Sequence, residues 1–415
     1  MSFPDVLQRG NDFLSEYPRD SSFWNPLSKL TCLAVIGASK AFVYSAYKPK
    51  IFGLEKLDDA LAKSKNENRG LLTIMNHMSV VDDPFLWGIL PFRYYRDVDA
   101  IRWGLGASNV CFTNNALKYF FSLGKVLATE RFGRGPFQGS IDAAIRILSP
   151  DDTLDLEYYP TCVQANIKKS SIQRLAKPEF ISDKIKPSST VIEKLKQSSP
   201  IQRSRPSWFH IFPEGFVLQL ESPHSNSMRY FHWGVSRLVL ESTKSPIILP
   251  IFSTGFEKIA PESAAESPLE RFLPRNFRHE INVIFGDPIN DAIIDGFRAE
   301  WRKLVDKHYD PANPFDLSEK LKFSKEAEEL RSRIAATLRE AVAEIRHNAG
   351  NFPVEDDRFK SPAFWKRFTL SEGESDPDIK FIGKNWAIRR LQKFLQDDFD
   401  KQVEVARKEE EEKKH

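Results

Sequence analysis

A histidine and an aspartate, separated by four residues, come directly after an apolar segment of the chain. They are His77 and Asp82, and the apolar segment is 70–75. An imidazole titrates close to neutral pH, and a neighbouring carboxylate can fix its tautomer and stabilise the imidazolium that forms when it accepts a proton. The pair therefore suggests a general base that acts on a hydroxyl group.

The spacing of this pair requires a turn. On a regular helix, five steps of 100° would place the two side chains about 140° apart. Pro84 supplies the turn, because it disfavours helical angles at Asp83 and is well tolerated as a first helical residue. We therefore predict that Asp83 caps a helix beginning at Pro84, which leaves Asp82 free to face His77. On spacing alone, it is equally consistent that these are ordinary turn and capping residues around an incidental histidine.

The elements that must position the pair follow an alternating order. Apolar strand-like segments alternate with helical patterns such as 137–148, which is typical of an α/β fold. The predicted strands are 70–75, 125–129, 208–212, 247–252 and 281–285. Beyond Trp301 the chain is predicted to be helical. Apolar residues at helical spacing in 330–345 predict a helix packed on the core or on a partner, and those in 388–399 predict an interfacial or docking helix.

The N-terminal region contains an uncharged run at 30–39, followed by aromatic residues. Because a membrane span needs about 20 apolar residues, this run is predicted to be too short to span and to lie in or dip into one leaflet. The alternative is a buried amphipathic helix of the globular core. Acidic residues near the N-terminus fit neither a secretory signal nor a transit peptide, so any organelle address must be internal.

The composition limits the class of protein. With 415 residues, 41% hydrophobic and 28% charged, the chain is expected to fold as one catalytic domain with extensions. Three cysteines without a CxxC pair, and histidines without metal-ligand spacing, predict no disulfide framework, no metal and no organic cofactor.

A basic insertion is predicted at about 163–205. Ten basic residues against three acidic ones give it a charge of +7, and since the whole chain carries +3, the remainder sums to −4. An anionic membrane surface is one partner that suits this charge, and a plain soluble loop is the alternative. Nucleic acid is not expected, because no recognition motif accompanies the charge.

Further segments with chemical potential follow the histidine in the chain. Segment 124–136 joins a strand to a helix start, where an anion is favoured and Arg131 or Arg134 could pair with a phosphate. Segment 210–215 ends another strand and puts Glu214 at a turn between a proline and Gly215.

These segments, together with the Pro-flanked apolar strand at 246–251, closely resemble the glycerolipid acyltransferase superfamily, whose blocks are NHxxxxD, a Gly/Arg segment, FPEG and such a strand. The resemblance covers roughly residues 1–290. It implies a mixed sheet flanked by helices, with an N-terminal membrane-associated helix and a C-terminal helical extension. The implied division is a membrane-interface segment at 1–50, the acyltransferase domain at 51–310 and the extension at 311–415.

The resemblance also implies roles for individual residues. His77 would deprotonate the free hydroxyl of a lysophospholipid while Asp82 orients its imidazole. Arg131 would hold a lipid phosphate, and Glu214 with Gly215 would shape the glycerol pocket of the acceptor. No serine nucleophile or acyl-enzyme is required.

Within the superfamily, segments 76–84, 121–125 and 229–234 resemble the mitochondrial phospholipid–lysophospholipid transacylases that remodel cardiolipin. This branch implies CoA-independent transfer from a phosphatidylcholine-type donor to monolysocardiolipin. It also implies a peripheral or monotopic protein on inner and outer mitochondrial membranes, facing the intermembrane space and entering protein complexes. The alternatives are an acyl-CoA-dependent lysophospholipid acyltransferase and a non-catalytic lipid-binding scaffold.

Overall fold

The computed structural model describes residues 24–97, 100–130, 135–149, 207–261, 273–310, 317–368 and 386–412. Three of the sequence predictions lie outside these ranges: the basic insertion at 163–205, the start of the N-terminal segment, and the arginines at 131 and 134.

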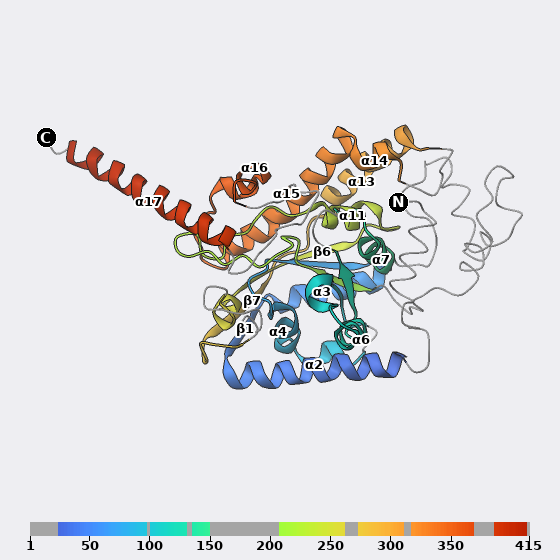
Figure 1. The fold of residues 1–415 in the computed structure, drawn as a ribbon. Helices are drawn as coiled ribbons and strands as arrows, with labels where there is room; N and C mark the ends of the chain where they lie inside the picture. The colour runs from blue at the N-terminus through green and yellow to red at the C-terminus, as the bar shows by residue number, and fades with distance from the viewer. Residues whose placement is uncertain are drawn as a thin grey trace, which may run out of the picture.

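A seven-stranded mixed sheet forms the centre of the fold (Figure 1). Its strands are β1 (Lys48–Phe52), β2 (Leu71–Met75), β3 (Trp103–Ala107), β4 (Val126–Thr129), β5 (Trp208–Ile211), β6 (Ile247–Thr254) and β7 (Glu280–Phe285). Their spatial order is β1-β7-β6-β2-β5-β3-β4, and every pair is parallel except β6 with β7. The predicted mixed sheet is therefore confirmed, and the carboxyl ends of β2, β3, β4 and β5 meet at one edge.

Helices cover both faces of this sheet (Figure 1). One face carries α7 (Gly139–Leu148), α11 (Trp233–Glu241), α13 (Asp291–His308), α14 (Glu319–Phe323) and α15 (Lys325–Asn348). The other carries α2 (Trp24–Ala46), α3 (Leu54–Glu67), α4 (Asp82–Ile89), η1 (Phe92–Tyr95) and α12 (Phe256–Ile259). The short α5 (Ser108–Cys111) and α6 (Asn115–Leu123) join β3 to β4. Side chains of β2 alternate between the two cores, as expected for a sheet buried on both faces.

The C-terminal extension packs on the domain in two ways. The helix predicted over 330–345 is α15, and its apolar side chains belong to the main core with those of β6 and α11. Beyond it, η6 (Asp357–Lys360), α16 (Pro362–Trp365) and the first part of α17 (Trp386–Glu412) form a smaller aromatic core with residues 216–220. The rest of α17 extends away from the body (Figure 1).

The five strands expected from apolar segments are present, but β1 and β3 were not predicted. The first has the sequence Lys-Pro-Lys-Ile-Phe and lies at the edge of the sheet, where charged residues and proline are tolerated. The second, Trp-Gly-Leu-Gly-Ala, contains two glycines, which weaken strand propensity. Tertiary pairing determines both strands.

Helix α2 lies along the domain and is fastened to it by polar contacts. The Ser28 hydroxyl donates to the carbonyl of Leu123 at the end of α6 (2.6 Å). The Lys40 ammonium donates to the carbonyls of Gly88 and Leu90 at the end of α4 (3.1 and 2.9 Å). A Cβ at Gly88 would come within 2.8 Å of the α2 backbone, so glycine permits this close packing.

The length of α2 corrects the prediction made from the uncharged run at 30–39. The helix has 23 residues, because Lys40 and the polar residues around the run continue it. In the part of the chain that the structure describes, it is the one helix long and apolar enough, by length and composition, to cross a membrane. Its inner face packs on α4 and α6, which agrees in part with the alternative of a helix belonging to the globular core.

Candidate active site

His77 and Asp82 lie in contact beyond the carboxyl end of β2. Nδ1 of His77 is 2.9 Å from Oδ2 of Asp82, and that oxygen also accepts from the backbone N–H groups of Met78 (2.6 Å) and Ser79 (2.9 Å). The Asp82 side chain is fully buried, whereas that of His77 is 22% exposed. The expected facing of the two side chains is therefore confirmed.

This contact assigns the two ring nitrogens of His77. Burial raises the pKa of the Asp82 carboxyl, and the hydrogen bonds from His77 and the two backbone amides act against that rise. Because the Asp82 oxygen accepts, Nδ1 of His77 is the donor, and Nε2 keeps the lone pair with which a base takes a proton.

The helix start differs from the prediction. Helix α4 begins at Asp82, so Asp83 is not its N-cap and Pro84 is its third residue. Proline fits there because the first four amides of a helix have no intrahelical acceptor. The carboxylate of Asp83 instead pairs with Arg102. Asp82 nevertheless faces the histidine, because the tight turn before the helix brings it back toward β2.

Asn76, the asparagine of the NHxxxxD block, fixes the end of β2. Its fully buried side chain donates from Nδ2 to the carbonyl of Ser253 (2.9 Å) and accepts from the Ser253 amide (2.8 Å). The residue thus joins β2 to β6 and sets the point at which His77 leaves the sheet. Its position just before the histidine is the one sequence signal that could have indicated this role.

Glu214 and Gly215 follow β5, but they occupy different positions. The Glu214 side chain is 1% exposed, and its two oxygens accept from the backbone amides of His77 (2.9 Å) and Arg229 (3.0 Å). Gly215 has φ +76°, which only glycine adopts readily, and it lines the pocket described below. Glu214 thus stabilises the loop that carries His77 through a hydrogen bond to its backbone and does not line the pocket.

An aromatic ring stacks on the imidazole of His77 and helps to orient it. Phe212 stacks on His77 with 4.4 Å between ring centroids, and His210 meets Phe212 edge-on at 4.7 Å. Burial lowers the pKa of His210 to about 3, so this imidazole is neutral at physiological pH. His210 therefore has a structural role, because it packs against the ring that stacks on His77.

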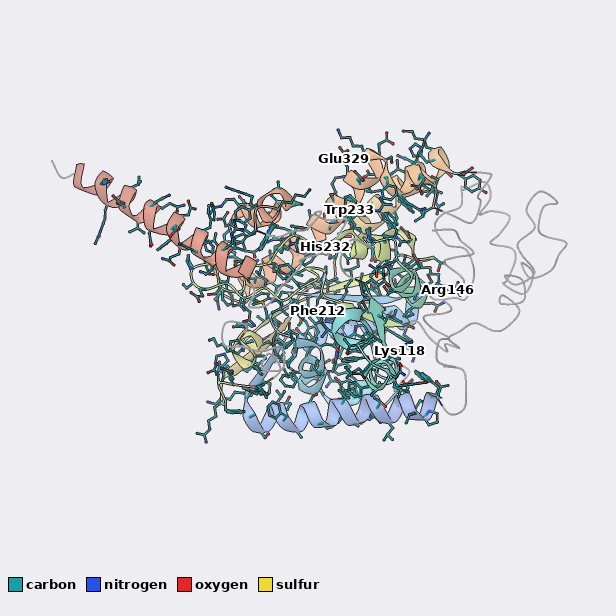
Figure 2. All side chains as sticks on the ribbon, viewed as in Figure 1. Lys118, Arg146, Phe212, His232, Trp233 and Glu329 are labelled. Carbon is teal, nitrogen blue, oxygen red and sulfur yellow. The ribbon has the colours of Figure 1, made fainter. Side chains whose placement is uncertain are left out.

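A pocket opens at the edge of the sheet where His77 lies, enclosing about 830 Å³ that includes space open to solvent. Its apolar lining includes Leu105, Ile141, Ile211 and Val235. Its polar side chains are His77, Thr129, Gln138 and His232. Figure 2 labels Phe212 and His232, which contribute to its wall. An apolar cavity that two imidazoles line, those of His77 and His232, suits a substrate that has a hydrocarbon chain and a reactive hydroxyl or ester.

Comparison with known proteins agrees with this arrangement. Residues 53–254 match the acyltransferase family. The chain is 56% identical to tafazzin of Saccharomyces cerevisiae over 396 residues, which cover 95% of this chain and 97% of that protein. The chain belongs to the tafazzin family of acyltransferases.

Two more distant relatives match part of this chain. The protein named Taffazin of Dictyostelium discoideum is 31% identical over 223 residues, 53% of this chain and 56% of that protein. N-acylphosphatidylethanolamine synthase of Arabidopsis thaliana is 27% identical over 259 residues, 62% and 68% of the two chains. The match to the acyltransferase family and to tafazzin shows that this tafazzin-family chain is an acyltransferase, and lipids are its substrates.

The predicted site residues of this tafazzin-family chain are only partly brought together. His77, Asp82, Glu214 and Gly215 gather at the ends of β2 and β5, whereas Arg131 lies outside the described residues. His232 belongs to segment 229–234 and was not predicted as a site residue. It lines the pocket from the N-terminal end of α11, and its backbone amide donates to the Pro213 carbonyl (3.0 Å).

Replacement of Glu214 by glutamine is expected to change how stability depends on pH. Burial raises the pKa of this carboxyl to about 8, whereas the unfolded chain releases the proton near its usual value. Between those two values the folded state keeps a proton that the unfolded state has lost, so the stability of the parent protein falls as pH rises. We expect this contribution to be about 3–5 kcal/mol across the window.

Glutamine does not titrate, but it offers one carbonyl oxygen to two amide donors, which costs about 1–3 kcal/mol. Thermal unfolding should therefore find Glu214→Gln less stable than the parent protein at pH 5, with the difference narrowing or reversing by pH 8. Parallel profiles for the two proteins would contradict the raised pKa.

Proposed function

We propose that the protein is a CoA-independent transacylase that moves an acyl chain from a phosphatidylcholine-type donor to monolysocardiolipin, with the His77 and Asp82 pair as general base. The observation that carries this proposal is the fully buried carboxylate of Asp82 on Nδ1 of His77, whose side chain lines an apolar pocket. The family supports acyl transfer, and the resemblance of segments 76–84 and 229–234 supports the choice of donor and acceptor.

In the proposed reaction, Nε2 of His77 takes the proton from the free hydroxyl of the acceptor. The acceptor oxygen forms a bond to the carbonyl carbon of the donor ester, and the bond from that carbon to the donor glycerol oxygen breaks. The imidazolium returns the proton to this leaving oxygen, which yields a lysophospholipid. One ester replaces another, so the exchange is close to thermoneutral and needs no thioester. Because the acceptor oxygen attacks the donor ester directly, no acyl-enzyme forms.

An apolar outer face supports a position at the membrane surface. Leu27, Leu30 and Leu33 on α2 are exposed, the middle one to 64%, and Tyr119 and Phe120 are exposed on the neighbouring α6. These side chains suit the boundary between head groups and acyl chains. A protein held at the membrane by such a face would take both lipids without moving a chain through water. We assign the protein to mitochondrial inner and outer membranes, facing the intermembrane space and joining complexes there.

The division into a membrane-interface segment, an acyltransferase domain at 51–310 and a helical extension is part of the proposal. The boundary at residue 50 falls inside β1, an edge strand of the sheet, and α15 belongs to the main core. We therefore propose that the three parts fold together.

The decisive experiment uses the purified full-length protein with vesicles of acyl-labelled phosphatidylcholine and monolysocardiolipin, with and without added acyl-CoA. We expect transfer without CoA, one lysophosphatidylcholine for each acylated product, and flotation of the protein with the vesicles. A strict requirement for acyl-CoA would support the acyl-CoA-dependent alternative. Vesicle binding without transfer under either condition would support a lipid-binding scaffold.

A second acceptor is worth including because one relative is named N-acylphosphatidylethanolamine synthase. Phosphatidylethanolamine offers an amine in place of a hydroxyl. If N-acyl product exceeds acylated cardiolipin in mixed vesicles, the proposed acceptor is wrong.

A further inference from the structure

Both backbone groups of His77 are held by the chain segment that follows β5. Its N–H donates to Glu214 Oε1 (2.9 Å), and its carbonyl accepts from the amide of Leu218 (3.0 Å). The position of the imidazole therefore depends on how segment 214–230 is itself held.

One anchor of this segment comes from the C-terminal extension. The backbone N–H of Arg229 donates to the second oxygen of Glu214, and Arg339 on α15 donates to the carbonyls of Arg229 (3.0 Å) and Met228 (2.8 Å). Glu355 completes the anchor, because it accepts from the Met228 amide (2.5 Å) and pairs with Arg339 (2.7 Å). All five residues are nine-tenths buried or more.

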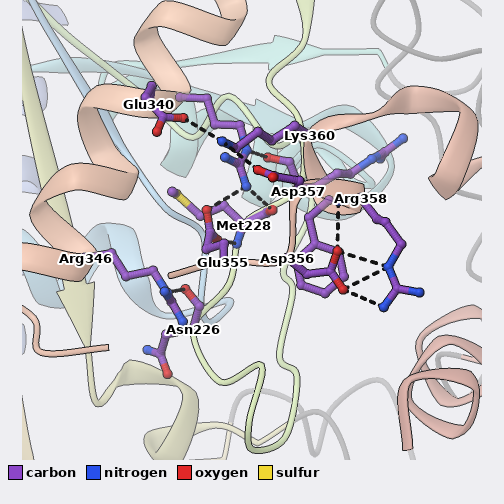
Figure 3. Close-up of polar contacts among 12 residues, drawn as sticks. Asn226, Met228, Glu340, Arg346, Glu355, Asp356, Asp357, Arg358 and Lys360 are labelled. Atoms are coloured by element: carbon purple, nitrogen blue, oxygen red, sulfur yellow. Dashed lines mark hydrogen bonds and ion pairs between the residues drawn. The ribbon is translucent and has the colours of Figure 1, made fainter. Parts of the chain in front are cut away.

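A second anchor lies about two helical turns further along α15. Arg346, 1% exposed, donates to the carbonyls of Asn226 (2.9 Å), Ser225 (2.8 Å) and Pro353. Figure 3 shows Arg346 against Asn226, with Met228 close to Glu355. Because the carbonyls of Ser225 and Asn226 would lose these donors if the segment moved, this arrangement has one favourable register.

A third anchor is aromatic. Phe216 and Leu218 pack with Trp365 of α16 and Leu391 of α17 in the smaller core. The Arg229 guanidinium lies over the rings of Phe216 (5.0 Å) and Trp365 (5.7 Å). The stretch whose Leu218 amide holds the His77 carbonyl is thus covered by the extension.

We propose that Arg339, Arg346 and Glu355, which lie beyond the region matching the acyltransferase family, are positioning residues for His77. They act through segment 225–229 and Glu214. The C-terminal extension is accordingly part of the catalytic apparatus, although it does not line the described pocket. This inference rests on the proposed role of His77 as the base.

The test replaces Arg346 by methionine in the full-length protein. Since a displacement of about 1 Å can cost about 10²-fold in rate, we expect kcat to fall about 10- to 100-fold while KM stays within about twofold. Arg346→Lys keeps the charge but not the fork of donors, so it should recover part of kcat. Hydrogen–deuterium exchange should accelerate in peptides covering 76–80 and 226–230, whose amides donate to Asp82, Glu214 and Glu355.

The matched control is Arg298→Met. Arg298 on α13 is half-buried and also donates to three backbone carbonyls, those of Val239, Leu240 and Ser242 (2.6, 3.2 and 2.8 Å), at the end of α11 that does not line the pocket. It should lose comparable thermal stability, keep kcat within about twofold and leave exchange in 76–80 unchanged. An Arg346→Met protein that behaves like this control would overturn the inference.

If Arg346→Met does not fold, Glu355→Gln is judged by the same criteria, because it removes a charge without removing bulk. The exchange measurement separates this inference from the proposed function. Full activity in His77→Ala would refute the proposed base while faster exchange in 76–80 still supported the structural link. Unchanged exchange would refute the link whatever the activity of His77→Ala.

Discussion

His77→Ala is expected to lower kcat/KM for acyl exchange by about 10²–10⁴-fold, the usual contribution of a positioned general base. Nε2 of this imidazole is the basic atom that the Asp82 contact leaves available at the pocket. Of the other histidines nearby, His210 is buried and neutral, and His232 lines the pocket from the start of α11. The side chain is 22% exposed and hydrogen-bonded to Asp82, so its removal should cost about 1 kcal/mol of stability and leave the protein folded. The measurement is acyl exchange in vesicles, with thermal unfolding and vesicle flotation on the same preparation.

His279→Ala is a suitable control. This histidine precedes β7, is partly exposed and does not line the pocket. Both variants should fold and bind vesicles equally, and only the first should lose activity. If His77→Ala retains more than about a tenth of the parent rate, another group takes the proton and the proposed mechanism is wrong.

The sequence predicted those parts of the site that depend on local order. His77, Asp82 and Glu214 stand directly after apolar segments, and parallel strands with their carboxyl ends at one edge bring such residues together. The α/β fold and helix α15 followed from hydrophobic periodicity, whereas the mixed sheet followed from the resemblance to the acyltransferase superfamily. These features can be predicted because each depends on residues within one or two helices or strands.

Contacts between distant parts of the chain could not be predicted in this way. The motif places Glu214 at a turn, but its use of both oxygens on the amides of His77 and Arg229 appears only when three separate segments meet. Lys40, which interrupts an apolar run in the sequence, caps the end of α4. At Gly106 in β3, a Cβ would come within 2.8 Å of Val126, so packing selects a residue that weakens the strand signal.

Asp82→Asn is expected to lower kcat by about 10³-fold with little change in stability. Asparagine can place its carbonyl where Oδ2 lies and still accept from His77, Met78 and Ser79. It carries no negative charge, however, and cannot stabilise the imidazolium that forms in the transition state. Its amide group would occupy the place of Oδ1, for which no hydrogen-bond partner exists among the described residues.

The comparison with Asp82→Ala separates the charge of this carboxylate from its hydrogen bonds. Alanine leaves three N–H donors without their acceptor in a fully buried position, at about 1–3 kcal/mol each, so this variant should unfold at clearly lower temperature. Burial already raises the pKa of Asp82, which means that the folded protein holds its charge at some cost, and the neutral asparagine avoids that cost. Equal activity loss with unequal thermal stability is therefore the expected result. An active Asp82→Asn protein would show that hydrogen bonding alone orients His77 and that the charge of the carboxylate is dispensable for acyl transfer.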